Sequence, residues 1–240
     1  MIKLEGLVKR FGDMVAVNGL TLEVPRGELF VFLGPNGAGK TTTIKLIVGL
    51  LRPTAGRVLL NGHDIQREPI AARSMLSYVP DQPFLYDKLT GREFLHFIGS
   101  VYGMTRQQIR DKTAYLSELF EVGDFLDELG QTYSHGMKQR VVVSAALLHE
   151  PRVLVIDEPM VGLDPKGANT LKAVLRQLVA EGVAVFMSTH TLAVAEETAD
   201  RVGIIREGSL IALGSLDEIY RTARTDRRLE EAFLRLTDEA

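Results

Sequence analysis

One segment of the 240-residue chain decides its fold, and it reads Gly34-Pro35-Asn36-Gly37-Ala38-Gly39-Lys40-Thr41. This is the pattern G-x-x-x-x-G-K-T, set between apolar residues 29–33 and an amphipathic stretch at 41–51, so it predicts a loop between a buried strand and a helix. Glycines in such a loop let successive backbone N–H groups face phosphate oxygens, and the following helix directs its positive end at the same anion. The pattern also arises by chance in Gly-rich turns, but this context favours a nucleoside triphosphate site.

The composition is that of a globular protein, with 45% hydrophobic and 25% charged residues. The length allows one large α/β domain, or one domain with a small lobe. A net charge of −3 gives no basic footprint for nucleic acid, and the absence of cysteine excludes a disulfide framework. The first six residues lack a signal-peptide apolar region, and the longest apolar runs are shorter than the roughly 20 residues that span a bilayer. We therefore expect a chain that is soluble on its own and needs a partner for any role at a membrane.

Hydrophobic periodicity predicts an α/β fold with a largely parallel sheet. Residues 2–24 alternate as antiparallel strands do, and Val58–Leu60 runs into the hairpin turn Asn61-Gly62. From Thr90 to about Gly130 the apolar residues recur at helical spacing, which predicts a small helical lobe. The other expected strands are 76–79, 153–156, 183–187, 202–205 and 210–213, and the other expected helices are 136–149, 169–180 and 192–199.

Two carboxylates follow one of the buried strands. Asp157 and Glu158 come directly after Val153–Ile156, at the end of a strand where open α/β sheets bind their ligands. With Thr41 supplying a hydroxyl to Mg²⁺ and Lys40 a charge to the β- and γ-phosphates, Asp157 is predicted to organise the metal shell. Glu158 is then placed to orient or deprotonate a water molecule. Two solvated acids at a strand end would be the alternative.

Two further segments have both a plain and a functional interpretation. His190 follows the expected strand 183–187 and is either a polar loop residue or a sensor of the γ-phosphate. Ser134 is a good N-cap for the helix that follows, and Gly136 permits close backbone approach. This helix start is either merely capped or a second phosphate-binding site that serves another copy of the chain.

The order of these motifs resembles the ATP-binding subunits of ABC transporters, from about residue 2 to 215. The motifs that carry the resemblance are Gly34–Thr41, Asp81-Gln82, Ser134–Met137, Val153–Glu158, Gly162-Leu163-Asp164 and His190. The resemblance implies a RecA-like P-loop NTPase core with an N-terminal antiparallel β subdomain. It places an ATP-binding domain at 1–215, with a helical lobe inserted at about 84–135, and a C-terminal helical tail at 216–240.

The resemblance also implies an activity and partners. Two copies, or one copy and a homologous subunit, would close head-to-tail over two ATP molecules with Mg²⁺, and hydrolysis would reopen them. The chain would thereby energise a separate integral membrane permease while lying in the cytoplasm, peripheral to the cytoplasmic face of the cell membrane. The alternative is a soluble ABC-type ATPase that acts on ribosomes or nucleic acid, which usually needs two nucleotide domains or basic surfaces. A metabolite kinase would leave Ser134–Met137 and His190 unexplained.

Site residues carry over position by position from the resemblance. The catalytic residues it implies are Glu158, His190 and Lys40. The implied ATP-binding residues are Phe11, Gly34, Pro35, Asn36, Gly37, Ala38, Gly39, Lys40, Thr41, Thr42, Ser134, Gly136 and Asp164. The implied metal ligands are Thr41, Asp157, and Asp81 or Gln82, whose register is open because both side chains offer oxygen. Phe11 would stack on adenine, with a core aromatic as the alternative.

The chain departs from the family pattern at three segments, the first being the metal-contacting position at Asp81 and Gln82 described above. The signature usually reads Leu-Ser-Gly-Gly-Gln, and here it is Tyr133-Ser134-His135-Gly136-Met137. If His135 lies near the phosphate, its protonated form would strengthen the closure of the two copies. The alternative is that His135 is a solvent-facing substitution without a role. Val161 stands directly before Gly162 where the family usually has a small serine, and Met160 follows Pro159; we interpret these as substitutions at the dimer seam.

Two surfaces suggest contacts with other molecules. Pro83–Tyr86 is apolar and aromatic and is expected either to touch the permease or to form a covered loop. The tail contains Leu229–Leu234, which resembles subunits that serve export permeases, so export is favoured over import. The tail is expected to pack on its own domain, with a partner chain or an anionic membrane surface as alternatives. A basic cluster in the tail consists of Arg221, Arg224, Arg227 and Arg228.

Overall fold

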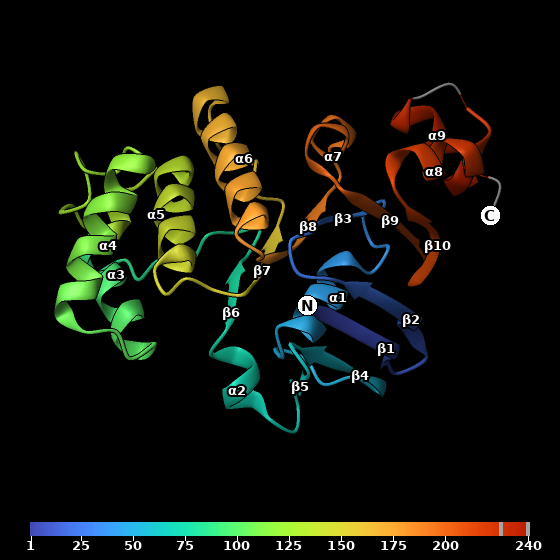
Figure 1. The fold of residues 1–240 in the computed structure, drawn as a ribbon, viewed down its shortest axis with the longest axis horizontal. Helices are drawn as coiled ribbons and strands as arrows, with labels where there is room; N and C mark the ends of the chain where they lie inside the picture. Colours follow the sequence, from blue (N-terminus) through green and yellow to red (C-terminus); the bar gives the residue numbers. More distant parts are fainter. Residues whose placement is uncertain (226–227, 239–240) are drawn as a thin grey trace.

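A computed structural model describes residues 1–225 and 228–238, so Arg227 of the basic cluster lies outside the described residues. Two sheets and a set of helices form the molecule, with the helical lobe and the C-terminal tail at opposite ends of its long axis (Figure 1). The strands are β1 (Ile2–Phe11), β2 (Met14–Val24), β3 (Leu29–Leu33), β4 (Ala55–Leu60), β5 (His63–Asp64), β6 (Leu76–Val79), β7 (Val153–Asp157), β8 (Ala184–Thr189), β9 (Arg201–Arg206) and β10 (Ser209–Gly214). The helices are α1 (Lys40–Ile47), α2 (Pro69–Arg73), α3 (Gly91–Val101), α4 (Arg106–Leu119), the short 3₁₀ helix Gly130–Thr132, α5 (His135–Leu147), α6 (Pro165–Ala180), α7 (Leu192–Thr198), α8 (Leu216–Ala223) and α9 (Leu229–Asp238).

The larger sheet has six strands in the order β10-β9-β3-β8-β7-β6. The pairs β6/β7, β7/β8, β8/β3 and β3/β9 are parallel, and β10 alone pairs antiparallel in this sheet. Every residue of β3, β7 and β8 is buried, as expected for strands covered on both faces. The predicted largely parallel sheet is confirmed. Its carboxyl edge brings together the residues that follow β3, β7 and β8.

The smaller sheet is antiparallel, with strand order β2-β1-β4-β5. The predicted hairpin turn is present, since Leu60 pairs with His63 across Asn61-Gly62. A core cluster joins this sheet to α1 and to one face of the larger sheet, and the rings of Phe30, Phe32 and Phe186 meet in it at centroid distances of 5.3 to 6.3 Å. This burial fixes β3, and therefore the loop after it, against the antiparallel subdomain.

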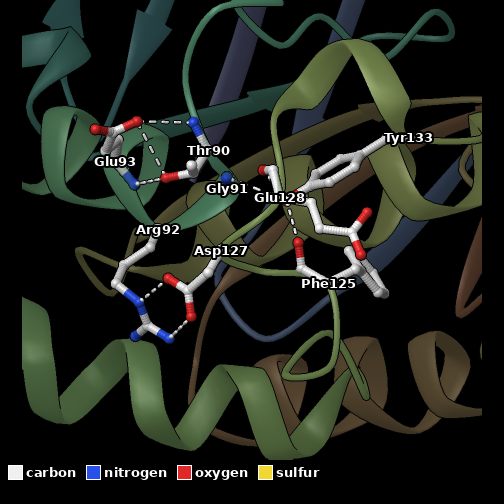
Figure 2. A network of polar contacts seen from close by, with 8 residues as sticks. All are labelled: Thr90, Gly91, Arg92, Glu93, Phe125, Asp127, Glu128 and Tyr133. Atoms are coloured by element: carbon white, nitrogen blue, oxygen red, sulfur yellow. Dashed lines mark hydrogen bonds and ion pairs between the residues drawn. The ribbon is translucent and has the colours of Figure 1, made fainter.

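The helical lobe consists of α3, α4 and the chain that leads into α5 (Figure 1). Thr90 caps α3 through a reciprocal capping box with Glu93, and Arg92 forms a two-point ion pair with Asp127 (Figure 2). Figure 2 also shows the Tyr133 hydroxyl, which donates to carbonyl oxygens at positions 125 and 128, at 2.7 and 3.1 Å, and accepts from the amide at position 91 at 3.1 Å. Because Tyr133 directly precedes Ser134, these bonds attach the start of α5 to the lobe.

The C-terminal helices α8 and α9 pack on their own domain, as the leading interpretation predicted. Leu229 and Ala232 are fully buried in the core cluster that contains α7. The carboxylate of Glu196 on α7 accepts a hydrogen bond from the Leu229 amide at 2.8 Å. Within the described residues, no helix has the length and apolar character that would take it across a bilayer.

Candidate nucleotide site

The loop after β3 has the predicted strand–loop–helix setting. Gly39 precedes α1 with φ at 106°, a backbone conformation that strongly favours glycine, and a Cβ there would overlap the carbonyl oxygen of Ala16. Lys40 is buried, and its Nζ donates to the carbonyl oxygens of Gly34 at 2.6 Å and Pro35 at 3.1 Å. Burial lowers the pKa of Lys40, against the opposing effect of the Glu158 and Asp157 carboxylates. The ammonium therefore lies inside the loop, bonded to its carbonyl oxygens.

A cavity of about 530 Å³ opens over this loop at the carboxyl edge of the larger sheet. We call it the nucleotide cavity. It brings together predicted residues from the carboxyl ends of four strands, β3, β6, β7 and β8, with residues of β2 and of the turn between β9 and β10. Its lining is Met14, Val15, Ala16, Asn36, Gly37, Gly39, Lys40, Thr41, Thr42, Asp81, Asp157, Glu158, His190, Glu207 and Gly208.

Asp157 ends β7 and is buried. Burial raises the pKa of its carboxyl, and the hydrogen bond from Ser188 partly offsets this by lowering the pKa. The Ser188 hydroxyl donates to Oδ1 and the Thr41 hydroxyl donates to Oδ2 at 3.3 Å. With Asp81 in the same cavity, the donors are hydroxyl and carboxylate oxygens, which suit Mg²⁺. Across the part of the chain that the structure describes, no three His, Cys, Asp or Glu side chains are grouped so that they could hold a metal ion.

Glu158 adopts an uncommon left-handed conformation, with φ at 47°. Its Oε1 lies 2.8 Å from Nδ1 of His190, and its Oε2 accepts from the Thr189 hydroxyl at 3.1 Å. The carboxylate is thus held at both oxygens by residues at the end of β8. Sequence reasoning missed Ser188 and Thr189, although their position directly before His190 at a strand end was a usable signal.

The structure separates a second group of predicted residues from this cavity. Ser134, Gly136 and Asp164, which we call the signature cluster, lie at the starts of α5 and α6 and outside the cavity lining. Ser134 caps α5 by accepting from the Met137 amide at 3.2 Å. A Cβ on Gly136 would lie 2.7 Å from the Gly162 carbonyl oxygen, so the first turn of α5 packs closely against the backbone of the loop before α6.

Asp164 caps α6, accepting from the Gly167 amide at 3.0 Å, and pairs with Arg140 at 2.6 Å. The Gly167 amide first, and Arg140 second, lower the pKa of the Asp164 carboxyl. Sequence reasoning missed Arg140, whose partner is 24 positions away along the chain. The ring of His135 rests over Gly162, so the signature cluster and the loop before α6 form one surface.

Two open assignments become clearer in the structure. Asp81 lines the nucleotide cavity and accepts from the Gln82 amide at 2.8 Å, whereas the side chain of Gln82 lies outside the lining. The geometry therefore favours Asp81 as the oxygen ligand. Phe11 is 44% exposed at the end of β1, with Nζ of Lys9 at 4.9 Å from its ring centre, so the alternative of a core aromatic is wrong.

A family model and individual relatives both match this chain to ATP-binding proteins of transporters. The family described as "ABC transporter" matches residues 17–161. The chain is 38% identical over 226 residues to daunorubicin resistance ATP-binding protein DrrA3 of Streptomyces coeruleorubidus, covering 94% of this chain and 72% of that one. It is 36% identical to linearmycin resistance ATP-binding protein LnrL of Bacillus subtilis, covering 91% and 70%. It is also 36% identical to the probable multidrug ABC transporter ATP-binding protein YbhF of Escherichia coli, of which it covers 41%.

Solved structures agree with the family match. An ATP-binding subunit of an ABC transporter superposes with a TM-score of 0.94 at 33% identity, over 98% of this chain and 99% of that one. The ATP-binding cassette MJ0796, solved as a dimer in a post-hydrolysis state with ADP and Pi, superposes with a TM-score of 0.83 at 25% identity, over 90% and 99%. The predicted fold class is confirmed.

Proposed function

We propose, since the chain belongs to the ABC transporter family and is an ATP-hydrolysing subunit of it, that two copies clasp Mg·ATP between them and drive a separate membrane permease. ATP would close the pair head-to-tail, and hydrolysis would let it reopen. The similarity to a cassette solved as a dimer with ADP and Pi supports this cycle.

The separation of the two groups of site residues carries the proposal. Lys40, Glu158 and His190 line the nucleotide cavity, while the signature cluster offers a capped helix start that lies outside the cavity lining. A helix N-terminus attracts phosphate, so the start of α5 is suited to the γ-phosphate held by another copy. In a two-fold pair the same surface serves both sites, and each copy completes the site of the other.

Within one site, the described contacts suggest a division of roles. Lys40 would bind the β- and γ-phosphates, and Thr41, Asp157 and Asp81 would hold Mg²⁺, which neutralises charge on the phosphates. Glu158 would take a proton from the attacking water, because both of its oxygens are already oriented by Thr189 and His190. His190 lies on the exposed side of that carboxylate, where it can meet the γ-phosphate.

An aromatic surface fits the permease contact. Phe84 and Tyr86 are 63% and 46% exposed, which contradicts the covered-loop alternative for these two side chains. Their rings pack edge-on at 5.1 Å, and Tyr86 meets exposed Phe97 of α3 at 6.0 Å. Such a contiguous aromatic patch is typical of a protein interface. Because the segment begins just after Asp81, a permease helix seated there would be mechanically connected to the metal site.

We further propose export as the direction of transport, and a position at the cytoplasmic face of the membrane. The names of three relatives refer to drug resistance or multidrug transport, which supports cargo of amphipathic, drug-like character. The tail segment Leu229–Leu234 is consistent with this class. The role on ribosomes or nucleic acid has no supporting observation in the fold or the relatives.

Sedimentation of Glu158→Gln tests the shared site. With saturating Mg·ATP, this variant should bind nucleotide, fail to turn it over and sediment with twice the mass of the single chain. Lys40→Ala is the matched control and should remain single. A Glu158→Gln protein that binds ATP and retains the single-chain mass, alone and with its membrane partner, would contradict the proposal.

Affinity purification from host membranes tests the permease contact. The wild-type chain should retain an integral membrane protein, and Phe84→Asp should release it while keeping wild-type ATP affinity. Gln107→Asp, an exposed change on α4, serves as the control. Recovery of ribosomes in place of a membrane protein would support the soluble ATPase instead.

A further inference from the structure

A second cavity lies at the opposite edge of the larger sheet from the nucleotide cavity. It measures about 560 Å³ and borders the residues that lead into β7 and β8, at their amino ends. One wall is α4 of the helical lobe, and the other is α6 of the core, which Figure 1 shows on either side of α5. We call it the junction cavity. Its volume falls within the roughly 300 to 1,000 Å³ of small-molecule sites.

The floor of the junction cavity is apolar. Leu116, Leu147 and Val174 are buried beneath it, and Leu119 and Leu178 are partly buried at its sides. Tyr115 stands at the mouth with 48% of its surface exposed, and Nζ of Lys112 lies over its ring, 5.6 Å from the ring centre, so the exposed part of the ring adds apolar surface at the edge of the cavity. This floor favours an apolar body over a polar one.

Some of the charged side chains around the mouth of the cavity have partners, and Arg152 has none within the described part of the chain. Lys112 pairs with Glu150 at 2.5 Å, and Gln177 donates to Glu181 at 2.8 Å. Arg152, in contrast, is exposed, and among the described residues its guanidinium makes no ion pair or hydrogen bond. Arginine binds carboxylates through two parallel hydrogen bonds. The Arg152 guanidinium can therefore bind a carboxylate at the edge of the apolar floor.

We propose that the junction cavity binds a small amphipathic carboxylate, whose acid group pairs with Arg152 and whose apolar body lies on the leucine and valine floor. The ligand would touch both the lobe and the core. Because Lys112 on α4 already pairs with Glu150 in the turn after α5, occupancy would add a second tie between these two parts. The proposal does not depend on the permease or on closure of two copies.

Isothermal titration calorimetry of the full chain with decanoate tests the site. Decanoate should bind once per chain with a saturable heat below 1 mM, and decyltrimethylammonium, which has a similar tail and the opposite charge, should not. Arg152→Ala should weaken decanoate binding about tenfold through loss of the two-point ion pair. Tyr115→Ala should weaken it severalfold through loss of apolar contact. Arg106→Ala, an exposed arginine of α4 outside the cavity, is the control and should bind as the wild type does.

The outcomes separate this site from the nucleotide cavity. Since the two cavities lie at opposite edges of the sheet, saturating ADP should leave the decanoate affinity unchanged. The proposal is overturned if decanoate gives no saturable heat, if Arg152→Ala binds as tightly as the wild type, if the ammonium binds equally well, or if ADP competes. Both variants change exposed side chains, and an unchanged thermal midpoint would show that they fold.

Discussion

Polar side chains of the nucleotide cavity bond to one another across β7, β8 and the phosphate loop, whereas Ser134 and Asp164 of the signature cluster bond to the first turns of α5 and α6 and to Arg140. In the nucleotide cavity, Asp157 takes two hydroxyl donors and Glu158 is bound at both oxygens. The signature cluster has helix caps and one ion pair, and its serine and aspartate are exposed. In the proposed cycle, one chain orients the groups that act on the water molecule, and its signature cluster is left for the phosphate of a second copy.

Among the changes that test this comparison, Glu158→Gln should have the largest effect, and the effect is on ATP turnover. Steady turnover should fall about 1,000-fold, within the range for loss of a general base. ATP affinity should stay near the wild-type value, because the amide keeps the size of the side chain. Phosphate release and equilibrium binding, measured on the same preparation, check both parts. Turnover within tenfold of the wild type would remove Glu158 from the role of base.

Lys40→Ala should affect binding itself. Loss of charge-assisted bonds to two phosphates should weaken ATP binding about 100-fold, as measured by calorimetry. Lys45→Ala, an exposed lysine in the last turn of α1, is the control and should bind normally. Equal affinity for both variants would mean that backbone N–H groups and the helix start hold the phosphates without this lysine.

Ser134→Ala should show the opposite division, with turnover reduced about tenfold and ATP affinity of the isolated chain unchanged. The serine is also the N-cap of α5, so its removal has a structural cost. Ser215→Ala removes a comparable cap from α8 and isolates that cost. If Ser134→Ala and Ser215→Ala lower turnover equally, the signature cluster has no role in hydrolysis beyond capping its helix.

The smallest expected effect concerns how the lobe that carries Ser134 is attached to the core. His149 stacks on Tyr102 at 3.5 Å, and burial lowers the pKa of its imidazole to about 4. The unfolded chain binds this proton below about 6.5 and the folded chain only near 4, so the free energy of unfolding should fall as pH drops through that window. We expect a loss of about 2 kcal/mol after allowance for partial exposure.

Urea unfolding at pH 7 and pH 4.5 measures this loss. His149→Phe keeps a ring against Tyr102 and removes the titration, so its stability should fall less than that of the wild type between the two pH values. The other titrating groups are shared by both proteins and cancel in the difference. An identical pH dependence would show that protonation of His149 does not oppose folding.

The sequence predicted the fold and the nucleotide cavity well because both depend on local patterns. The phosphate loop, the strand that ends in Asp157 and the hairpin turn at Asn61-Gly62 are each contiguous, and hydrophobic periodicity reports contiguous elements directly. The Ser134 cap could be predicted for the same reason. Each of these features was confirmed where the structure bears on it.

The contacts that escaped prediction depend on the pairing of distant segments. Ser188 reaches Asp157 because β7 and β8 pair in parallel with these two residues opposite each other. Asp81 and Gln82 are neighbours with similar chemistry, and only the path of the chain after β6 determines which one enters the cavity. A shift of one residue changes which way a side chain points, and composition does not report it.

The contact between His135 and Gly162 restricts the order in which these two positions can change. Gly162 has φ at 80°, and a Cβ on it would overlap the imidazole of His135. Substitution of the histidine by a smaller residue is therefore expected to come first, while position 162 is still glycine. The reverse route, beginning with a larger residue at 162, meets both a steric and a backbone barrier. Among descendants of this sequence, variety at 135 should come before any at 162.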